Sequence, residues 1–261
     1  MISEQQQIAS TALQTIVSDP MFQTLDLVGI IALSISGTII AATEGYSFYG
    51  ALVLAALPAM GGGFLRDLLA GVSPPSMMAE PDDIEAVIAT VVVGYLFNLA
   101  VHQLSGRSLV FYDLVQLYVR TKRRVSPKVV LEIMDAVGMA ALTMVGVHVA
   151  LAQHAEPLWL WGPVFSVITT TGGFICRDAI RSDRKIAVLK TTIYGEVSVV
   201  WALALSLFIL WQGDRASAGV IQAAVYGAAV GAFVSRLWFI ARGTTAPSFR
   251  SAARPASLDD H

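Results

Sequence analysis

The chain has 261 residues, of which 55% are hydrophobic and only 14% are charged, whereas soluble domains carry about 25% charged residues. This composition excludes an ordinary soluble domain and indicates a membrane protein with several spans. The formal net charge of −2 provides no basic field for nucleic acid. The single cysteine, Cys176, excludes an intrachain disulfide and a cysteine-based metal cluster.

Seven apolar segments are long enough to cross a bilayer, which takes about 20 residues of helix. Helices are expected, because an open sheet edge would leave unpaired backbone groups in lipid. In chain order, the expected transmembrane helices are 24–43, 48–70, 84–104, 130–151, 158–180, 191–211 and 218–240. The polar stretch 1–23 is expected to lie outside the membrane, and 241–261 is expected to be a disordered tail. The fold class is therefore an all-α polytopic membrane protein.

Lysine and arginine, which favour cytoplasmic loops, are divided unequally between the two sides of this predicted bundle. Of the 17, 13 lie in 105–129, 181–190 and 241–261, which are therefore assigned to the cytoplasm. The other side holds only Arg215, and it is assigned the N-terminus, 44–47, 71–83, 152–157 and 212–217. This places the N-terminus outside and the C-terminus in the cytoplasm.

The cytoplasmic loop 105–129 contains a further apolar run at 109–119, which is too short to span the bilayer. Four basic residues follow it closely: Arg120, Lys122, Arg123 and Arg124. The pattern favours an interfacial helix with a basic end that binds anionic lipid. An ordinary cytoplasmic loop is the alternative.

Two sequence patterns each occur twice. Gly-Gly-x-x-x-Arg-Asp occupies 61–67 and 172–178, and Asp-x-Val-Gly-x7-Gly occupies 26–37 and 135–146. The segments 24–104 and 130–211 are therefore predicted to be related units of three helices. Because three is odd, the second unit enters the membrane from the opposite side, which is the inverted-repeat architecture of transporters and channels. The segment 218–240 is a seventh helix outside the repeats.

Charged residues are costly inside a membrane and mark functional sites by default. The topology predicts Asp26 and Arg66 near the outer face, and Asp135 and Arg177 near the cytoplasmic face. Neighbouring residues do not face each other on a helix, so each arginine is expected to pair with the aspartate of the preceding helix or with a polar group of the other repeat. The candidate pore or gate network is Asp26, Arg66, Asp67, Asp135, Arg177, Asp178 and Glu196.

Glu196 and Arg236 also allow interpretations that need no role in a pore. Glu196 falls about six residues into the segment 191–211, and a paired structural role is the alternative to a functional one. Arg236 lies near the cytoplasmic end of 218–240 and is expected to extend to the membrane interface.

The glycines allow two interpretations. They let helices pack closely, or they kink a helix so that free backbone carbonyls line a polar path. Pro58 and three consecutive glycines favour a kink in 48–70. For 158–180, the sequence supports close packing and a kink about equally. Three threonines beside the second motif either line a pore or bond their own helix backbone. The candidate pore or kink residues are Gly61, Gly62, Gly63, Gly172, Gly173, Thr169, Thr170 and Thr171.

The paired motifs, the two three-helix repeats, the seventh helix and the external N-terminus resemble the prokaryotic members of the trimeric intracellular cation channel family, which are sometimes labelled a glycine-transporter domain. The resemblance covers roughly 24–240. It implies a homotrimer in the cell inner membrane, with a potassium-permeable pore in each protomer lined by the kinked second and fifth helices. The second motif, Gly-Gly-Phe, is one glycine short of the first.

The resemblance implies no cofactor besides the permeant ion, K+ or Na+. A secondary transporter of a small solute, such as the amino acid glycine, is the alternative, because inverted repeats suit both. An enzyme is not expected, since the chain has no Ser/His/Asp set and no His-Glu-x-x-His motif. The four histidines and one cysteine show no metal-ligand spacing, so no bound metal is expected.

Overall fold

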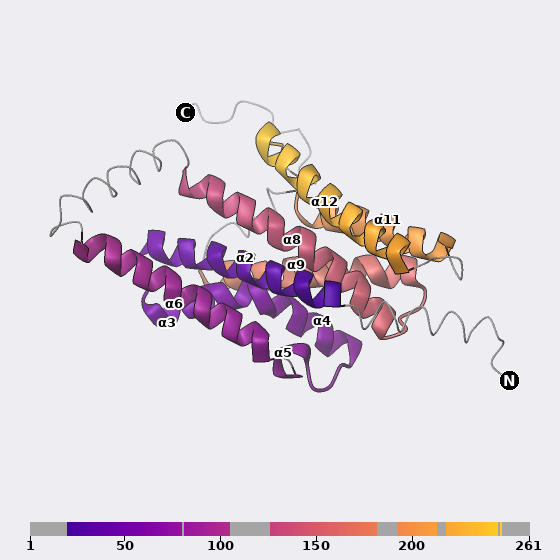
Figure 1. Ribbon diagram of the computed structural model, residues 1–261, viewed down its shortest axis with the longest axis horizontal. Helices are drawn as coiled ribbons and strands as arrows, with labels where there is room; N and C mark the ends of the chain where they lie inside the picture. Colours follow the sequence, from indigo (N-terminus) through magenta and orange to yellow (C-terminus); the bar gives the residue numbers. More distant parts are fainter. Residues whose placement is uncertain are drawn as a thin grey trace, which may run out of the picture.

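The computed structural model describes residues 20–79, 81–104, 126–181, 193–212, 218–244 and 246. This part of the chain is built from helices, and seven spans are long and apolar enough to cross a membrane. The helices are α2 (Pro20–Glu44), α3 (Phe48–Ala56), η1 (Leu57–Gly61), α4 (Gly62–Ala70), α5 (Ser76–Ala79), α6 (Pro81–Leu104), α8 (Pro127–Ala152), α9 (Leu158–Ile180), α11 (Gly195–Gln212) and α12 (Ala218–Arg242) (Figure 1). The second span is continuous through α3, η1 and α4.

All seven predicted spans are confirmed, and the protein is an integral membrane protein. Three other predictions lie outside the described residues: the polar stretch before residue 20, the interfacial helix at 109–119 with its basic end, and the tail beyond residue 246.

The two repeats make reciprocal contacts, as two halves related by a two-fold axis would. An added Cβ on Gly29 of α2 would lie 2.9 Å from Leu142 Cδ2 of α8, and one on Gly138 of α8 would collide with Leu33 of α2. Each residue of one contact stands 109 positions from its counterpart in the other. The predicted inverted repeat is therefore visible in the packing, with α2 corresponding to α8, the second span to α9, and α6 to α11.

The described ends of the chain lie on opposite sides of the bundle. α2 begins at the right of Figure 1, whereas α6 ends, α8 begins and α12 ends toward the left. Glu44, at the end of α2, binds Arg181, which follows α9. The assignment of 44–47 to the side opposite 181–190 is therefore wrong; an odd number of spans separates this turn from the N-terminus. It contains no lysine or arginine, so the charge count is unchanged.

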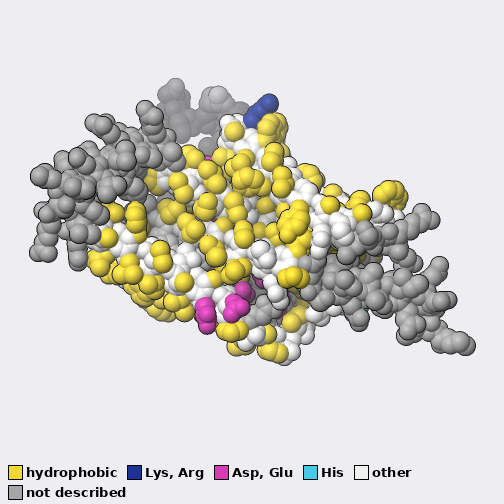
Figure 2. All heavy atoms as spheres, viewed as in Figure 1, with side chains coloured by type: hydrophobic (Ala, Val, Ile, Leu, Met, Phe, Trp, Pro, Cys, Tyr) yellow, Lys and Arg dark blue, Asp and Glu magenta, His cyan; other side chains and the backbone are white. Residues whose placement is uncertain are grey.

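The helices at the centre of the bundle are α2, α8 and α9, which are the most enclosed, while α6 is the most exposed. Apolar side chains cover much of the face seen in Figure 2. Val93 and Leu96 of α6 are among the exposed apolar side chains, which suits contact with lipid. The charged side chains of the repeated motifs are instead turned inward, between the helices.

Candidate functional site

The two glycine motifs meet where the second span crosses α9. A Cβ on Gly62 would collide with the carbonyl oxygen of Thr169, and a Cβ on Gly173 would collide with the carbonyl oxygen of Leu57 and lie 2.8 Å from Pro58 Cα. Leu57 contacts Gly173 and Gly62 contacts Thr169, so the residue numbers rise along the second span while they fall along α9. The two helices are therefore antiparallel. The glycines allow their backbones to touch, as small residues do in membranes.

The second span is distorted at this crossing. Residues Leu57–Gly61 form a π-helix with Pro58 inside it. Proline has no N–H for the carbonyl four residues earlier and clashes with it, and single π-turns are a recognised cause of helix kinks. The predicted distortion of the second span is confirmed.

The fifth span is different, because α9 runs without interruption from Leu158 to Ile180. Gly172 and Gly173 lie inside a regular helix, and their Cα hydrogens face Gly62 and Leu57 of the other repeat. The contacts of Gly172 and Gly173 bear out close packing, and the helix is not unwound at these glycines, although it contains Pro163 in its interior; the glycine kink expected in the fifth span stays a prediction. The second motif lacks both the third glycine and an equivalent of Pro58.

The three threonines of α9 bond their own helix. The Oγ1 atoms of Thr169, Thr170 and Thr171 donate to the carbonyls of the preceding turn at 2.6, 2.9 and 2.6 Å. This satisfies their hydroxyl hydrogens inside the bundle. Thr169 Oγ1 also lies 3.5 Å from Arg66 Nη1, so one threonine joins the two repeats.

The first-repeat site consists of Asp26, Arg66, Asp67, Ser76 and Asp83, which line one pocket. Arg66 and Asp67 are 4% and 1% exposed, and Arg66 Nε and Nη2 donate to Asp67 Oδ1 at 2.9 and 2.7 Å. The other carboxylate oxygen accepts from the backbone N–H and the hydroxyl of Ser76 at 2.8 and 2.6 Å. Both partners of the ion pair therefore belong to the motif. Ser76, the first residue of α5, holds the Asp67 carboxylate in place.

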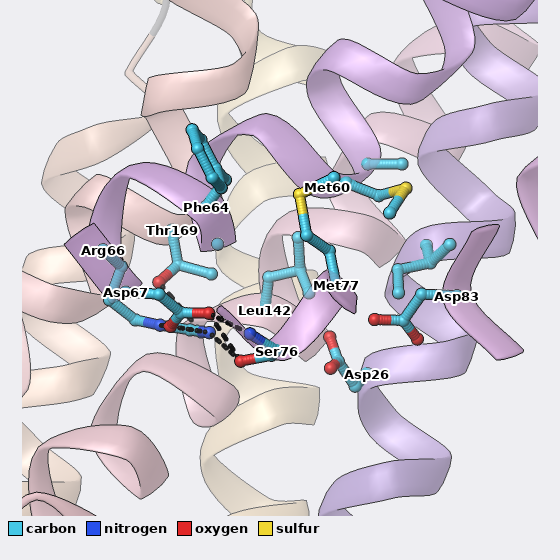
Figure 3. A pocket seen from close by; sticks show the side chains of 13 residues that line it. Asp26, Met60, Phe64, Arg66, Asp67, Ser76, Met77, Asp83, Leu142 and Thr169 are labelled. Carbon is cyan, nitrogen blue, oxygen red and sulfur yellow. Dashed lines mark hydrogen bonds and ion pairs between the residues drawn. The ribbon is translucent and has the colours of Figure 1, made fainter. Parts of the chain in front are cut away.

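Asp26 of α2 faces the same pocket from another side. Figure 3 shows Asp26 and Asp83 projecting toward one another across the pocket from the Arg66–Asp67 pair. Asp26 and Arg66 line the same pocket, and the predicted contact of Arg66 with a polar group of the other repeat is made to Thr169. The prediction that neighbouring Arg and Asp cannot pair is wrong, because the long arginine side chain turns back along its own helix.

The second-repeat site consists of Asp135, Arg177, Asp178, Tyr194 and Arg236. Arg177 donates from Nε to Asp178 Oδ1 at 3.1 Å, with Nη2 at 3.0 Å from the same oxygen. Asp135 is buried and interacts electrostatically with Arg177 and Arg236. The motif again pairs its own arginine and aspartate, whereas Asp135 Oδ1 and Arg177 Nη1 are buried without a hydrogen-bond partner among the described residues. The predicted pairing of Arg177 with Asp135 is therefore wrong.

Arg236 of α12 enters this site from outside the repeats. It is 7% exposed, its Nη1 donates to the carbonyl of Ile193 at 3.0 Å, and its guanidinium carbon lies 5.3 Å from the centre of the Tyr194 ring. The expectation that Arg236 extends to the membrane interface is wrong. Inside the protein its Nη1 bonds a carbonyl and its guanidinium lies against an aromatic face, while its Nε is buried without a hydrogen-bond partner in the part of the chain that the structure describes.

Glu196 does not belong to either buried site. α11 begins at Gly195, so Glu196 lies in its first turn, where it is exposed and its Oε2 accepts from the N–H of Tyr194 at 3.1 Å. An acidic residue in this position stabilises a helix N-terminus. The helix starts four residues later than the apolar run suggests, so Glu196 lies at the very start of the sixth span, and its place in the hydrocarbon stays a prediction.

Four members of the two sites, Ser76, Asp83, Tyr194 and Arg236, were not predicted as site residues, and neither was the neighbouring Phe174. Ser76 and Tyr194 carry no motif, and each lies just outside a span, where sequence pattern is weak. Phe174 was visible as a mismatch, because it occupies the position of Gly63 in the other motif. It is 1% exposed and lies against both Arg177 and Tyr194.

Removing the hydroxyl of Ser76 is expected to weaken the first-repeat site. Ser76→Ala deletes a hydrogen bond to a buried carboxylate, and such bonds contribute about 1.5–3 kcal/mol. The expected result is a loss of that size in the free energy of unfolding, measured by denaturant titration in detergent micelles. Thr24→Ala is the control, since Thr24 Oγ1 makes an exposed bond to its own helix. Equal losses in the two variants would contradict the proposed anchoring.

Comparison with known proteins gives consistent results. A family model described as "Glycine transporter" matches residues 23–101 and 132–212, which are the two repeats. The UPF0126 inner membrane protein YadS of Escherichia coli (strain K12) is 30% identical over 176 residues, which are 67% of this chain and 73% of YadS. The UPF0126 membrane protein YvgT of Bacillus subtilis (strain 168) is 28% identical over 202 residues, covering 74% of this chain and 82% of YvgT.

Solved structures share the fold. The TRIC trimeric intracellular cation channel orthologue from Rhodobacter sphaeroides superposes with a TM-score of 0.68 at 22% identity, over 86% of this chain and all of that one. A prokaryotic TRIC channel solved in 0.5 M KCl gives a TM-score of 0.64 at 20% identity, over 85% of this chain and 96% of that one. The arrangement of seven helices in two inverted repeats is thus a known fold.

Proposed function

Because the chain belongs to the family described as "Glycine transporter" and has the fold of the TRIC channels, we propose that it is a channel for monovalent cations such as potassium. The observation that carries this proposal is the pair of buried Arg-Asp sites on opposite sides of one glycine crossing. Charged groups buried in a membrane protein are costly and mark ion pathways. Two such sites at the ends of one antiparallel crossing define a path.

The path runs from the first-repeat site, past the contacts of Gly61 with Gly173 and of Gly62 with Gly172, to the second-repeat site. At the first-repeat site three carboxylates, Asp26, Asp67 and Asp83, face one guanidinium, so the formal charge attracts cations. Each arginine is neutralised by its neighbouring aspartate and therefore does not present a bare positive charge to an ion. Backbone carbonyls at the crossing would replace part of the ion's hydration.

The cellular setting follows the relatives. We place the protein in the inner membrane, as the name of YadS states for that protein, with the N-terminus outside on the evidence of the lysine and arginine distribution. We also propose a homotrimer, since the Rhodobacter sphaeroides orthologue is described as trimeric. Each protomer holds both sites within its own helices, so each has its own pore.

Recording from purified protein in a planar lipid bilayer tests the proposal. Discrete unitary currents in potassium chloride are expected. Saturable uptake of a small solute such as glycine, coupled to protons or sodium and without unitary currents, would instead identify a secondary transporter. That outcome is the alternative that inverted repeats also support.

A further inference from the structure

The two copies of the repeated motif differ at their third, fourth and fifth positions, and the third position lies beside the arginine. Gly63 of the first motif lines the pocket of the first-repeat site. An added Cβ there would lie 3.6 Å from Arg66 Nη2, so the absent side chain leaves space beside the guanidinium. The equivalent position in the second motif, 111 residues later, is Phe174. A benzyl group therefore occupies, at the second-repeat site, the place that is open at the first.

Phe174 is held in a row of four side chains. Its ring lies 4.6 Å from the guanidinium carbon of Arg177 and 4.9 Å from the ring of Tyr194, at an interplanar angle of 67°. The Tyr194 ring in turn lies 5.3 Å from the guanidinium carbon of Arg236. Cations within about 6 Å of a ring centre are attracted to its face, and edge-to-face rings attract each other. The guanidinium groups of Arg177 and Arg236 thus lie at the two ends of the edge-to-face pair Phe174 and Tyr194, and these four side chains are called the clamp.

The clamp is held by bonds within the second repeat and by one residue, Arg236, from outside the repeats. Tyr194 donates from its hydroxyl to the carbonyl of Asp135 at 3.2 Å, and Arg236 donates to the carbonyl of Ile193 at 3.0 Å. Phe174 and Tyr194 are 1% and 2% exposed. Arg236 comes from α12, which has no counterpart in the first three helices. The seventh helix therefore supports an arrangement that the pseudo-symmetry alone does not build.

We infer that Phe174 and Tyr194, clamped between Arg177 and Arg236, form a gate that closes the path at the second-repeat site. The inference rests on the proposed channel function and adds the position of the closed point. An apolar constriction blocks ions because an ion cannot shed its water there, and such constrictions gate by dewetting. Opening requires the rings to leave the clamp, and α12 is the element whose displacement would release them.

Single-channel recording of Phe174→Gly tests the gate. This variant restores the third glycine of the motif, and a several-fold rise in open probability over the unmodified protein is expected. Phe174→Leu is the matched control, because it keeps an apolar side chain in the gap, and it should remain closer to the unmodified protein. A folded Phe174→Gly protein with unchanged open probability would overturn the inference.

Arg236→Gln gives a second measurement that leaves both rings in place. It removes one arm of the clamp and is expected to raise open probability, and it decides the question if Phe174→Gly does not fold. Arg242→Gln is its control, since Arg242 lies on the same helix but is exposed against Trp238, and no change is expected. If the open probability were equal in the unmodified protein, in Phe174→Gly and in Arg236→Gln, the proposed gate would be wrong, while the proposed channel function would still hold. Absence of unitary current in every variant would overturn both.

Discussion

Asp67→Asn is expected to lower the free energy of unfolding by about 3–5 kcal/mol, the cost of removing one partner of a buried ion pair. Arg66 is 4% exposed, and its two shortest hydrogen bonds end on Asp67. Without that carboxylate its charge remains buried without its direct ion-pair partner, although Asp26 and Asp83 line the same pocket. Denaturant unfolding in detergent micelles measures the loss, and the unitary current should fall with it.

Two further variants test whether the loss of stability in Asp67→Asn comes from leaving a charge buried without its partner or simply from losing an ion-pair contact. Lys128→Gln breaks an exposed pair in α8 with a nitrogen–oxygen distance of 3.7 Å, and such pairs contribute about 0–1 kcal/mol. The double change Arg66→Leu with Asp67→Leu removes both charges and should recover much of the stability lost in Asp67→Asn. A similar loss in Asp67→Asn and Lys128→Gln would contradict the account of this site.

Gly173→Ala is the second variant with a large expected effect. Its Cβ would collide with the carbonyl of Leu57 and lie 2.8 Å from Pro58 Cα, and backbone atoms cannot turn aside as a flexible side chain can. Overpacking costs typically about 1–3 kcal/mol, and the second span must move away from α9. We expect a lower thermal unfolding midpoint together with an altered unitary current.

The control for the crossing is Gly219→Ala in α12. An added Cβ there meets no atom within 4 Å, and alanine favours a helix over glycine by up to about 1 kcal/mol. The unfolding midpoint should therefore be unchanged or higher. If Gly173→Ala behaved in the same way as Gly219→Ala, the two helices would not be in backbone contact at the crossing.

The spans and the repeat could be predicted from the sequence, because both depend on properties that the sequence displays directly. A run of about 20 apolar residues is itself the requirement for crossing a bilayer. A pattern that recurs after an odd number of helices has to be inverted. The distortion of the second span was likewise predictable, since Pro58 removes a backbone donor wherever it stands.

The pairing of charges was not predictable in the same way. Spacing on a helix fixes where each Cβ points, but a guanidinium lies several bonds beyond its Cβ, so Arg66 reaches the neighbour that the spacing rule excludes. Glu196 illustrates a different difficulty: a shift of four residues in the start of α11 moves it from the second turn of the predicted span to the exposed first turn of the observed helix.

The partners contributed by distant segments required the structure. Arg236 and Tyr194 share no motif, yet α12 and the segment before α11 bring them together beside Asp135. The substitution of Phe174 for a third glycine was visible as a departure from the repeat. Its consequence, a filled space between two guanidinium groups, depends on where Tyr194 and Arg236 lie.

The reversal potential of the unitary current in a gradient of potassium chloride tests the central claim most directly. If the two Arg-Asp sites lie at the two ends of one cation path, unitary currents will appear and will reverse near the equilibrium potential of potassium. Currents that reverse near the chloride potential would contradict a cation path. Solute uptake without any unitary current would contradict a channel.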